Sequence, residues 1–286
     1  MYKIAILGCE NSHANAFLDL IIKDKVYTDI EVLGVYSDDI EAANKLKDEY
    51  GVEVAKSFDE YVGKVDGIVI TARHGDNHYK YAKPYISSGI PMFIDKPITV
   101  SEKDAEEFKA ELIKNNVKIS GGSSLKHPAG IEELKKAVAE KEYGEVYGGI
   151  LRAPVSMAND YGDFFFYSQH LVQMTGEVFG YYPNSVKAFR NKDGINCTVR
   201  YDACDVNLEF IDGNYKYFAG ISCENDFVVK TISLDGCYAK EFSEFYTILT
   251  GGKQPQDYDE FFAPVYVMNA IDRSLKNGTE EFVKKG

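Results

Sequence analysis

The chain has 286 residues, which is more than one small core needs and suits two domains of ordinary size. Its composition, 45% hydrophobic and 27% charged, is typical of a globular protein and excludes a disordered chain. Its net charge of −13 repels nucleic acid and anionic membranes, so we expect neither as a partner.

The first 121 residues alternate strand patterns with helix patterns. Short apolar runs predict strands over residues 2–7, 31–36, 66–71, 90–94 and 117–120. Apolar residues at helical spacing predict helices between them, including one over 40–50 that stops at Gly51 and one over 78–88 that contains Pro84. This alternation predicts an α/β fold whose N-terminal Rossmann-type domain, residues 1–121, has a parallel sheet with covered faces.

The pattern changes near Gly121 and Gly122. After a predicted helix over 131–138, strand-like stretches follow at 145–152, 182–188, 195–201, 206–211, 215–221 and 227–234. Helices are predicted to close the chain at 241–250 and 261–277. Because these strands follow one another without helices between them, residues 122–286 are predicted to form an α+β domain with an open, mainly antiparallel sheet.

Cysteine usage and the absence of targeting patterns bear on location. The start of the chain enters a strand pattern without a signal-peptide pattern, and no apolar run approaches the roughly 20 residues of a membrane span. The five cysteines include no CxxC pair, which favours reduced thiols over disulfides or a zinc site. We therefore expect a cytoplasmic protein.

The first strand-to-helix turn is a candidate phosphate-binding loop. It reads Gly8, Cys9, Glu10, Asn11, Ser12, His13. In the dinucleotide fingerprint GxGxxG, glycines allow a tight turn, the approach of the pyrophosphate and close helix packing. Only Gly8 fits. The helix N-terminus still offers N–H groups to a phosphate, but the bulk and charge of Glu10 should hinder a pyrophosphate. A turn that binds no nucleotide therefore stays open as the alternative.

The end of the second strand is where a Rossmann domain reads the ribose. Here it carries Tyr36, Ser37, Asp38 and Asp39. A carboxylate at this place accepts the ribose hydroxyls and repels a 2′-phosphate, so Asp38 favours NAD over NADP. Ser37 stands where an acid often sits, and Asp38 or Asp39 could instead only cap the next helix.

Two further residues are candidates for catalysis. Lys96 follows the fourth strand, at the sheet edge where ligands bind, and its ammonium could polarise a substrate oxygen. His170 lies in an aromatic segment and could serve as a general base, although a histidine packed on an amphipathic helix would look the same.

The segment His74-Gly75-Asp76-Asn77-His78 alternates ligand-type side chains. It could be interpreted as a metal site, but its place in a strand-to-helix loop favours a contact with cofactor or substrate, and we expect no metal. The residues that we expect to bind the cofactor are Gly8, Cys9, Glu10, Asn11, Ser12, His13, Ser37, Asp38, Thr71, His74, His78, Asp95 and Lys96.

In this order, these segments resemble the Gfo/Idh/MocA oxidoreductase family over nearly the whole chain. The family's Glu-Lys-Pro motif is present as Asp95-Lys96-Pro97. The resemblance implies an oxidoreductase that uses NAD, with NADP as the other option, to transfer a hydride to or from a sugar, inositol or related polyol. It also implies that the second domain binds the substrate, and that its open sheet forms the interface of a homo-oligomer, a dimer or a tetramer.

The resemblance assigns roles to two residues. Lys96 matches the motif lysine, which would hold and polarise the reacting oxygen, and His170 matches a histidine that would take the hydroxyl proton. Many members place an aspartate four residues before this histidine, where this chain has Phe166. This departure, with those at Glu10 and His13, keeps two alternatives open: a catalytically silent ligand-binding or regulatory protein, and a lyase or epimerase that uses the cofactor transiently.

Overall fold

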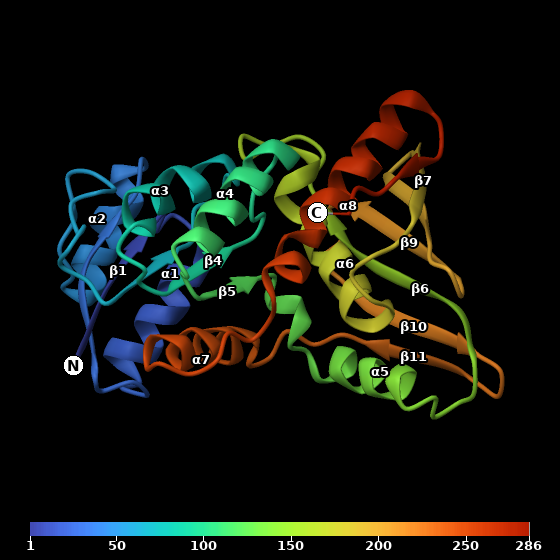
Figure 1. The fold of residues 1–286 in the computed structure, drawn as a ribbon, viewed down its shortest axis with the longest axis horizontal. Coiled ribbons are helices and arrows are strands. Elements are labelled where there is room, and N and C mark those ends of the chain that lie inside the picture. The colour runs from blue at the N-terminus through green and yellow to red at the C-terminus, as the bar shows by residue number, and fades with distance from the viewer. Residues whose placement is uncertain (286) are drawn as a thin grey trace. The chain divides into compact units, whose positions relative to one another are not determined.

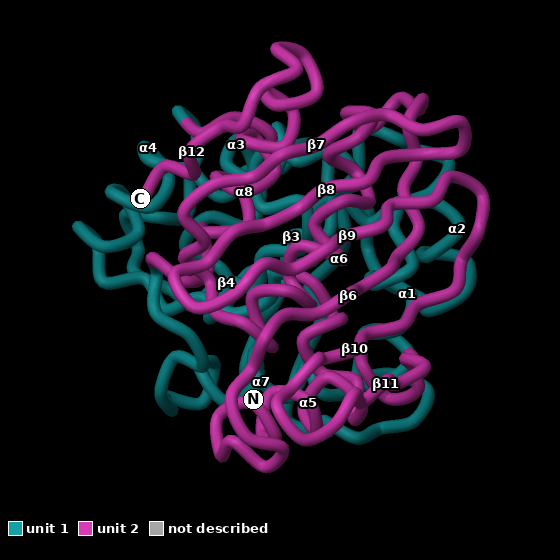
Figure 2. The backbone as a smooth tube through the Cα atoms, turned by 90° about the vertical axis from the view of Figure 1, so that its right-hand side faces the viewer, with its two compact units in different colours: residues 1–99, 103–122, 238–258 teal, residues 100–102, 123–237, 259–286 magenta. Residues whose placement is uncertain are grey.

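The computed structural model describes residues 1–285, which divide into two compact units (Figure 2). Unit 1 comprises residues 1–99, 103–122 and 238–258, and unit 2 comprises residues 100–102, 123–237 and 259 onward. The domain boundary predicted after residue 121 lies one residue before the change from unit 1 to unit 2, which falls between residues 122 and 123. Residues 238–258, which the sequence division placed in the C-terminal domain, group with unit 1.

Unit 1 is built on a five-stranded sheet, in which Figure 1 labels β1, β4 and β5. The strand order is β2-β1-β3-β4-β5. The strands are β1 (Tyr2–Leu7), β2 (Ile30–Tyr36), β3 (Gly67–Ile70), β4 (Met92–Asp95) and β5 (Ile119–Gly122). Every pairing is parallel. This confirms the predicted Rossmann-type parallel sheet, and it gathers the residues that follow the strands at one edge.

Helices connect and cover these strands. They are α1 (Ser12–Leu18), which continues into a π-helical segment η1 (Asp19–Lys23), α2 (Ile40–Tyr50), α3 (Asp76–Ile86), α4 (Glu102–Lys114) and α7 (Cys237–Leu249). Asp39 caps α2, because its side chain accepts hydrogen bonds from the N–H groups of Glu41 and Ala42. Gly51 ends α2 in the left-handed conformation, as predicted.

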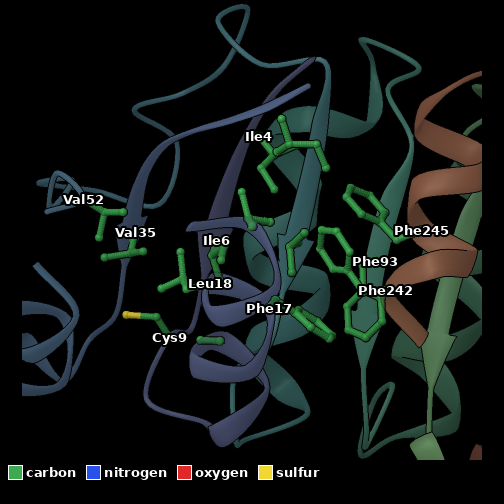
Figure 3. Close-up of a cluster of buried hydrophobic side chains, with 14 of the residues drawn as sticks. Ile4, Ile6, Cys9, Phe17, Leu18, Val35, Val52, Phe93, Phe242 and Phe245 are labelled. Atoms are coloured by element: carbon green, nitrogen blue, oxygen red, sulfur yellow. The ribbon is translucent and has the colours of Figure 1, made fainter. Parts of the chain in front are cut away.

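The main core of unit 1 joins segments that are far apart in the sequence. Phe17 of α1 contacts Phe93 of β4 and Phe242 of α7, each with ring centroids 5.0 Å apart (Figure 3). Phe93 also contacts Phe245 of α7 edge-on. Burying a phenylalanine contributes about 1.5–3 kcal/mol, so these contacts explain why α7 belongs to unit 1.

Gly8 ends β1 in a turn that no other residue fits. Its φ is +75°, and an added Cβ would lie 2.4 Å from the main chain of Ala72. Gly63 has nearly the same φ, +72°, but nothing within 4 Å. We expect Gly8→Ala to lower the free energy of unfolding by at least about 2 kcal/mol more than Gly63→Ala, because only the former adds a clash to the backbone strain. Urea unfolding of both variants measures the difference, and equal losses would show that the contact with Ala72 is unimportant.

Unit 2 is built on a seven-stranded sheet with the order β11-β10-β6-β9-β8-β7-β12 (Figure 1). The strands are β6 (Val146–Val155), β7 (Ser185–Asn191), β8 (Gly194–Arg200), β9 (Asp205–Asp212), β10 (Phe218–Cys223), β11 (Phe227–Thr231) and β12 (Glu281–Phe282). Only β6 and β9 pair in parallel; the other neighbours are antiparallel. The predicted mainly antiparallel sheet is thus confirmed.

The helical segments of unit 2 include one that the chain-order prediction left out. They are η2 (Ser124–Lys126), α5 (Ala129–Ala139), α6 (Phe164–Phe179) and α8 (Tyr258–Asn277). The omitted helix is α6, which is buried along most of its length and therefore lacks the polar face that gives a clear helical period. Within residues 1–285, no helix is long and apolar enough to cross a membrane.

Candidate active site

The candidate site of unit 1 lies along the carboxyl edge of its parallel sheet, where the residues following β1, β2, β3 and β4 gather. Thr71 ties two of these segments together, because its N–H donates to Leu7 O at 2.8 Å and its hydroxyl donates to Gly8 O at 3.0 Å. Thr71 is fully buried. It fixes the turn after β1, and its hydroxyl is already used for that purpose.

Glu10 reaches from this turn to the ends of two other strands. Its Oε2 accepts a hydrogen bond from Ser37 Oγ at 2.6 Å, after β2, and its Oε1 accepts one from the N–H of Arg73 at 3.0 Å, after β3. Ser37 Oγ accepts in turn from the N–H of Asp39 at 3.0 Å. The carboxylate at the second fingerprint position is therefore anchored at the end of β2.

Asp38, the predicted ribose-binding residue, is already engaged by two tyrosines. Tyr36 donates to Oδ1 at 2.6 Å and Tyr81 donates to Oδ2 at 2.7 Å, while Lys80 lies 3.6 Å from the same Oδ2. The hydrogen bond from Tyr36 is the main cause that lowers the pKa of Asp38. Asp38 is an ionised, half-exposed carboxylate, and each of its oxygens already accepts one hydrogen bond within the protein.

His13, at the third fingerprint position, lies in a buried cluster of charged groups. Its Nδ1 is 3.1 Å from Asp95 Oδ2, and its Nε2 is 3.3 Å from Glu241 Oε2. Asn11 donates to the same Asp95 oxygen at 2.8 Å. His13, Asp95 and Glu241 are each at most 3% exposed. Burial lowers the pKa of His13 and raises the pKa of Asp95 to about 6, against the opposing effect of His13 and Lys96 on Asp95.

Lys96 follows β4 directly and is 4% exposed. Burial lowers its pKa, and the carboxylates of Asp95 and Glu241 oppose that effect. Its N–H donates to Asp95 Oδ1 at 2.7 Å, and a cis peptide bond joins it to Pro97. The fold therefore places a dehydrated ammonium group at the edge where ligands bind in parallel α/β sheets.

The two histidines of the loop after β3 differ in their surroundings. His78 is fully buried, its Nε2 lies 2.8 Å from Ala72 O, and burial lowers its pKa to about 4. His74 is 31% exposed and accepts a hydrogen bond from the N–H of Asp76. Among residues 1–285, no group of three or more His, Cys, Asp or Glu side chains could hold a metal ion.

The remaining predicted residues of this turn are Cys9 and Ser12. Cys9 is 2% exposed, and burial raises the pKa of its thiol to about 12, so it is a packing residue rather than a thiolate. Ser12 is exposed, and its hydroxyl lies 3.3 Å from the hydroxyl of Tyr238.

His170 belongs to unit 2, whereas Lys96 belongs to unit 1. It lies on α6, is 7% exposed, and its Nδ1 is 2.7 Å from Ser123 Oγ. When Nδ1 donates to that oxygen, Nε2 carries the lone pair that a general base needs. Phe166, four residues before His170, contacts the rings of Tyr161 and Tyr167.

Three residues that contact the candidate site residues were not predicted from the sequence. Ser123 orients His170, Tyr81 holds Asp38, and Glu241 faces His13. Ser123 follows the Gly-Gly pair at which the domain change was predicted, so its position carried some signal. Glu241 carried none, because its helix lies in a region that the sequence assigned to the other domain.

Comparisons with known proteins support the fold of unit 1. The family model GFO_IDH_MocA, described as "Oxidoreductase family, NAD-binding Rossmann fold", matches residues 2–123. No curated protein matches the sequence.

Solved structures share the fold over the whole chain. A myo-inositol 2-dehydrogenase from Lactobacillus plantarum is 13% identical, with a TM-score of 0.85 and 99% of each chain covered. A myo-inositol dehydrogenase from Corynebacterium glutamicum is 17% identical, with a TM-score of 0.83 and 100% of each chain covered. A scyllo-inositol dehydrogenase from Lactobacillus casei, with bound NAD(H) and scyllo-inositol, is 15% identical, with a TM-score of 0.83 and 99% of each chain covered.

Proposed function

We propose that the chain is an NAD-dependent dehydrogenase, on the premise that residues 2–123 match the model of the GFO_IDH_MocA oxidoreductase family with its NAD-binding Rossmann fold. Its substrate would be a sugar, an inositol or a related polyol, from which a hydride passes to the nicotinamide. The observation that carries this proposal is the buried lysine at the carboxyl end of β4, in a chain whose structural neighbours include inositol dehydrogenases.

The turn after β1 is where we propose that the phosphates of the dinucleotide bind. Asn11, at the N-terminus of α1, forms no side-chain cap: its amide nitrogen donates to Asp95, and its Oδ1 accepts from Ser12 Oγ at 3.3 Å. No capping side chain therefore covers the first amides of this helix, and such amides bind anions. NAD, when bound, would supply the nicotinamide that accepts or returns the hydride.

Lys96 and His170 divide the acid–base work in this proposal. The ammonium of Lys96 would hold the reacting oxygen and stabilise the alkoxide charge that develops on it, an effect that a water-poor environment strengthens. His170 would accept the hydroxyl proton at Nε2 while Ser123 fixes the ring through Nδ1. Ser123 thus takes the orienting part for which the family often uses an aspartate.

The role of His170 has a direct test. We expect His170→Gln to lower kcat by about 10²–10⁴-fold with unchanged NADH binding, because the variant lacks a general base. Ser123→Ala should have a smaller effect of about tenfold, since it only loosens the ring. Steady-state kinetics and an NADH titration measure both, and full turnover by His170→Gln would refute the assignment.

Assembly and location complete the proposal. The outer face of the unit 2 sheet carries exposed apolar side chains, which are Tyr147, Ile150, Phe189, Phe227 and Val229. We propose that this face joins copies of the chain into a dimer or a tetramer, because such a patch marks an interaction surface. Light scattering gives the mass, and a monomer at micromolar concentration would contradict it. The free cysteines favour a reducing compartment, so we also propose a cytoplasmic location.

The activity is tested by supplying NAD and a panel of inositols, sugars and polyols, and following the absorbance of NADH. Turnover of at least one compound supports the proposal. Saturable NADH binding without turnover of any compound, with NAD or with NADP, would instead indicate a catalytically silent protein.

A further inference from the structure

We infer that Glu10 binds the adenosine ribose of the dinucleotide in place of the acid that usually follows the second strand, and that it thereby selects NAD over NADP. This inference rests on the proposed function and deepens it, since it names the residue that chooses the cofactor. The observation that supports it is that the carboxylate of Glu10, in the turn after β1, is hydrogen bonded at the end of β2.

Two positions of the cofactor-binding pattern differ from the usual residue types in a complementary way. Where the fingerprint has a glycine, this chain has Glu10, and where an acid often follows β2, it has Ser37. These two residues are hydrogen bonded to each other, with Ser37 Oγ donating to Glu10 Oε2 at 2.6 Å. A carboxylate that could accept hydrogen bonds from the ribose hydroxyls is therefore present at the end of β2, although it comes from the turn after β1.

Glu10 is held in place by two hydrogen bonds and can still accept others. The N–H of Arg73 anchors its other oxygen at 3.0 Å, so both oxygens are fixed from the ends of β2 and β3. A carboxylate offers about four lone-pair sites, of which these contacts use two. The hydroxyl of Ser37 is committed, since it donates to Glu10 and accepts from the N–H of Asp39.

Asp38 is the weaker candidate for binding the ribose. Its two oxygens accept hydrogen bonds from Tyr36 and Tyr81, and Lys80 lies 3.6 Å away. Lys80 also reduces the net negative charge that a 2′-phosphate would meet at Asp38. The two hydrogen-bond partners of Glu10, a hydroxyl and an amide, carry no net charge, so they do not offset a carboxylate that would accept ribose hydroxyls and repel a phosphate.

The test compares the binding of NADH and NADPH, measured by fluorescence titration of the full chain. The variants are Glu10→Gln, which keeps the shape but removes the charge, Asp38→Asn, and Glu53→Gln as a control at a 75% exposed carboxylate. Thermal unfolding checks that each variant is folded. We expect Glu10→Gln to lower the preference for NADH over NADPH about tenfold or more, because it loses charge-assisted hydrogen bonds and the repulsion of the 2′-phosphate. Glu53→Gln should leave the preference unchanged.

Three results would overturn the inference. An unchanged preference in Glu10→Gln would show that Glu10 does not read the ribose. An equal gain in affinity for both cofactors would show that Glu10 is only an obstruction. A larger loss of preference in Asp38→Asn would assign the role to Asp38. A separate outcome concerns the wild type alone: if it binds neither NADH nor NADPH, the proposed function fails too. The three results above, in contrast, are seen only in the variants.

Discussion

Replacing Lys96 by alanine is expected to slow hydride transfer by about 10²–10⁴-fold, while NADH binding persists. Lys96 is 4% exposed, so a developing alkoxide would interact with its ammonium group in a medium of low effective dielectric constant. Steady-state kinetics on an accepted substrate, with a separate NADH titration, measures the two effects. Lys103→Ala, at an 82% exposed lysine of α4, is the matched control and should keep full activity.

The Lys96 variant also needs a check on folding. Removing this cation leaves Asp95 and Glu241 without an ammonium that favours their ionised forms, and a buried charge without compensation is costly. Lys96→Met fills more of the same space, so it separates a lost charge from a lost volume. If Lys96→Ala and Lys96→Met are both folded and keep full turnover, Lys96 has no catalytic role.

The second large effect is a loss of stability in acid that depends on His78. Burial lowers the pKa of this ring to about 4 from a usual value of 6.5. The unfolded chain therefore binds a proton on His78 below pH 6.5 that the folded protein does not accept until about pH 4. Stability is complete above pH 6.5 and is lost as the pH falls toward 4, by about 3 kcal/mol in total.

Urea unfolding at pH 7 and pH 5 measures this effect in the wild type and in His78→Gln. The share of the acid-induced loss that disappears in the variant should be about 2 kcal/mol. The difference between the proteins is informative because Asp95 acts in the opposite direction: its raised pKa makes the folded state gain a proton first, which stabilises the protein in acid. His74→Gln, at a partly exposed ring of the same loop, is the control. Equal acid sensitivity in all three proteins would contradict the account.

The sequence predicts the fold better than the site. The strands of unit 1 are short apolar runs between glycine and polar turns, and local patterns of this kind specify a parallel sheet whatever ligand it binds. Gly51 was identified as the end of α2 for a local reason, its left-handed backbone. Helix α6 was considered only as the alternative interpretation of the His170 segment and was left out of the chain-order prediction, because burial on nearly all sides removes the polar face on which the helical period depends.

The site depends on contacts between distant segments, which a local pattern does not contain. Glu10 was expected to obstruct the turn, yet its carboxylate is anchored by Ser37 and Arg73. Asp38 was chosen as the acid that binds the ribose, yet its two oxygens accept hydrogen bonds from Tyr36 and Tyr81. In each case the residue type was informative, but the partner that decides its role is brought there by the fold.

A titration of the purified full chain with NADH tests the central claim, that unit 1 is a dinucleotide-binding domain. The account predicts a saturable enhancement of NADH fluorescence, reversed by added NAD and weaker with NADPH. No saturable binding of NADH or NADPH by the folded protein would contradict it, and would leave a Rossmann fold that no longer holds a nicotinamide cofactor.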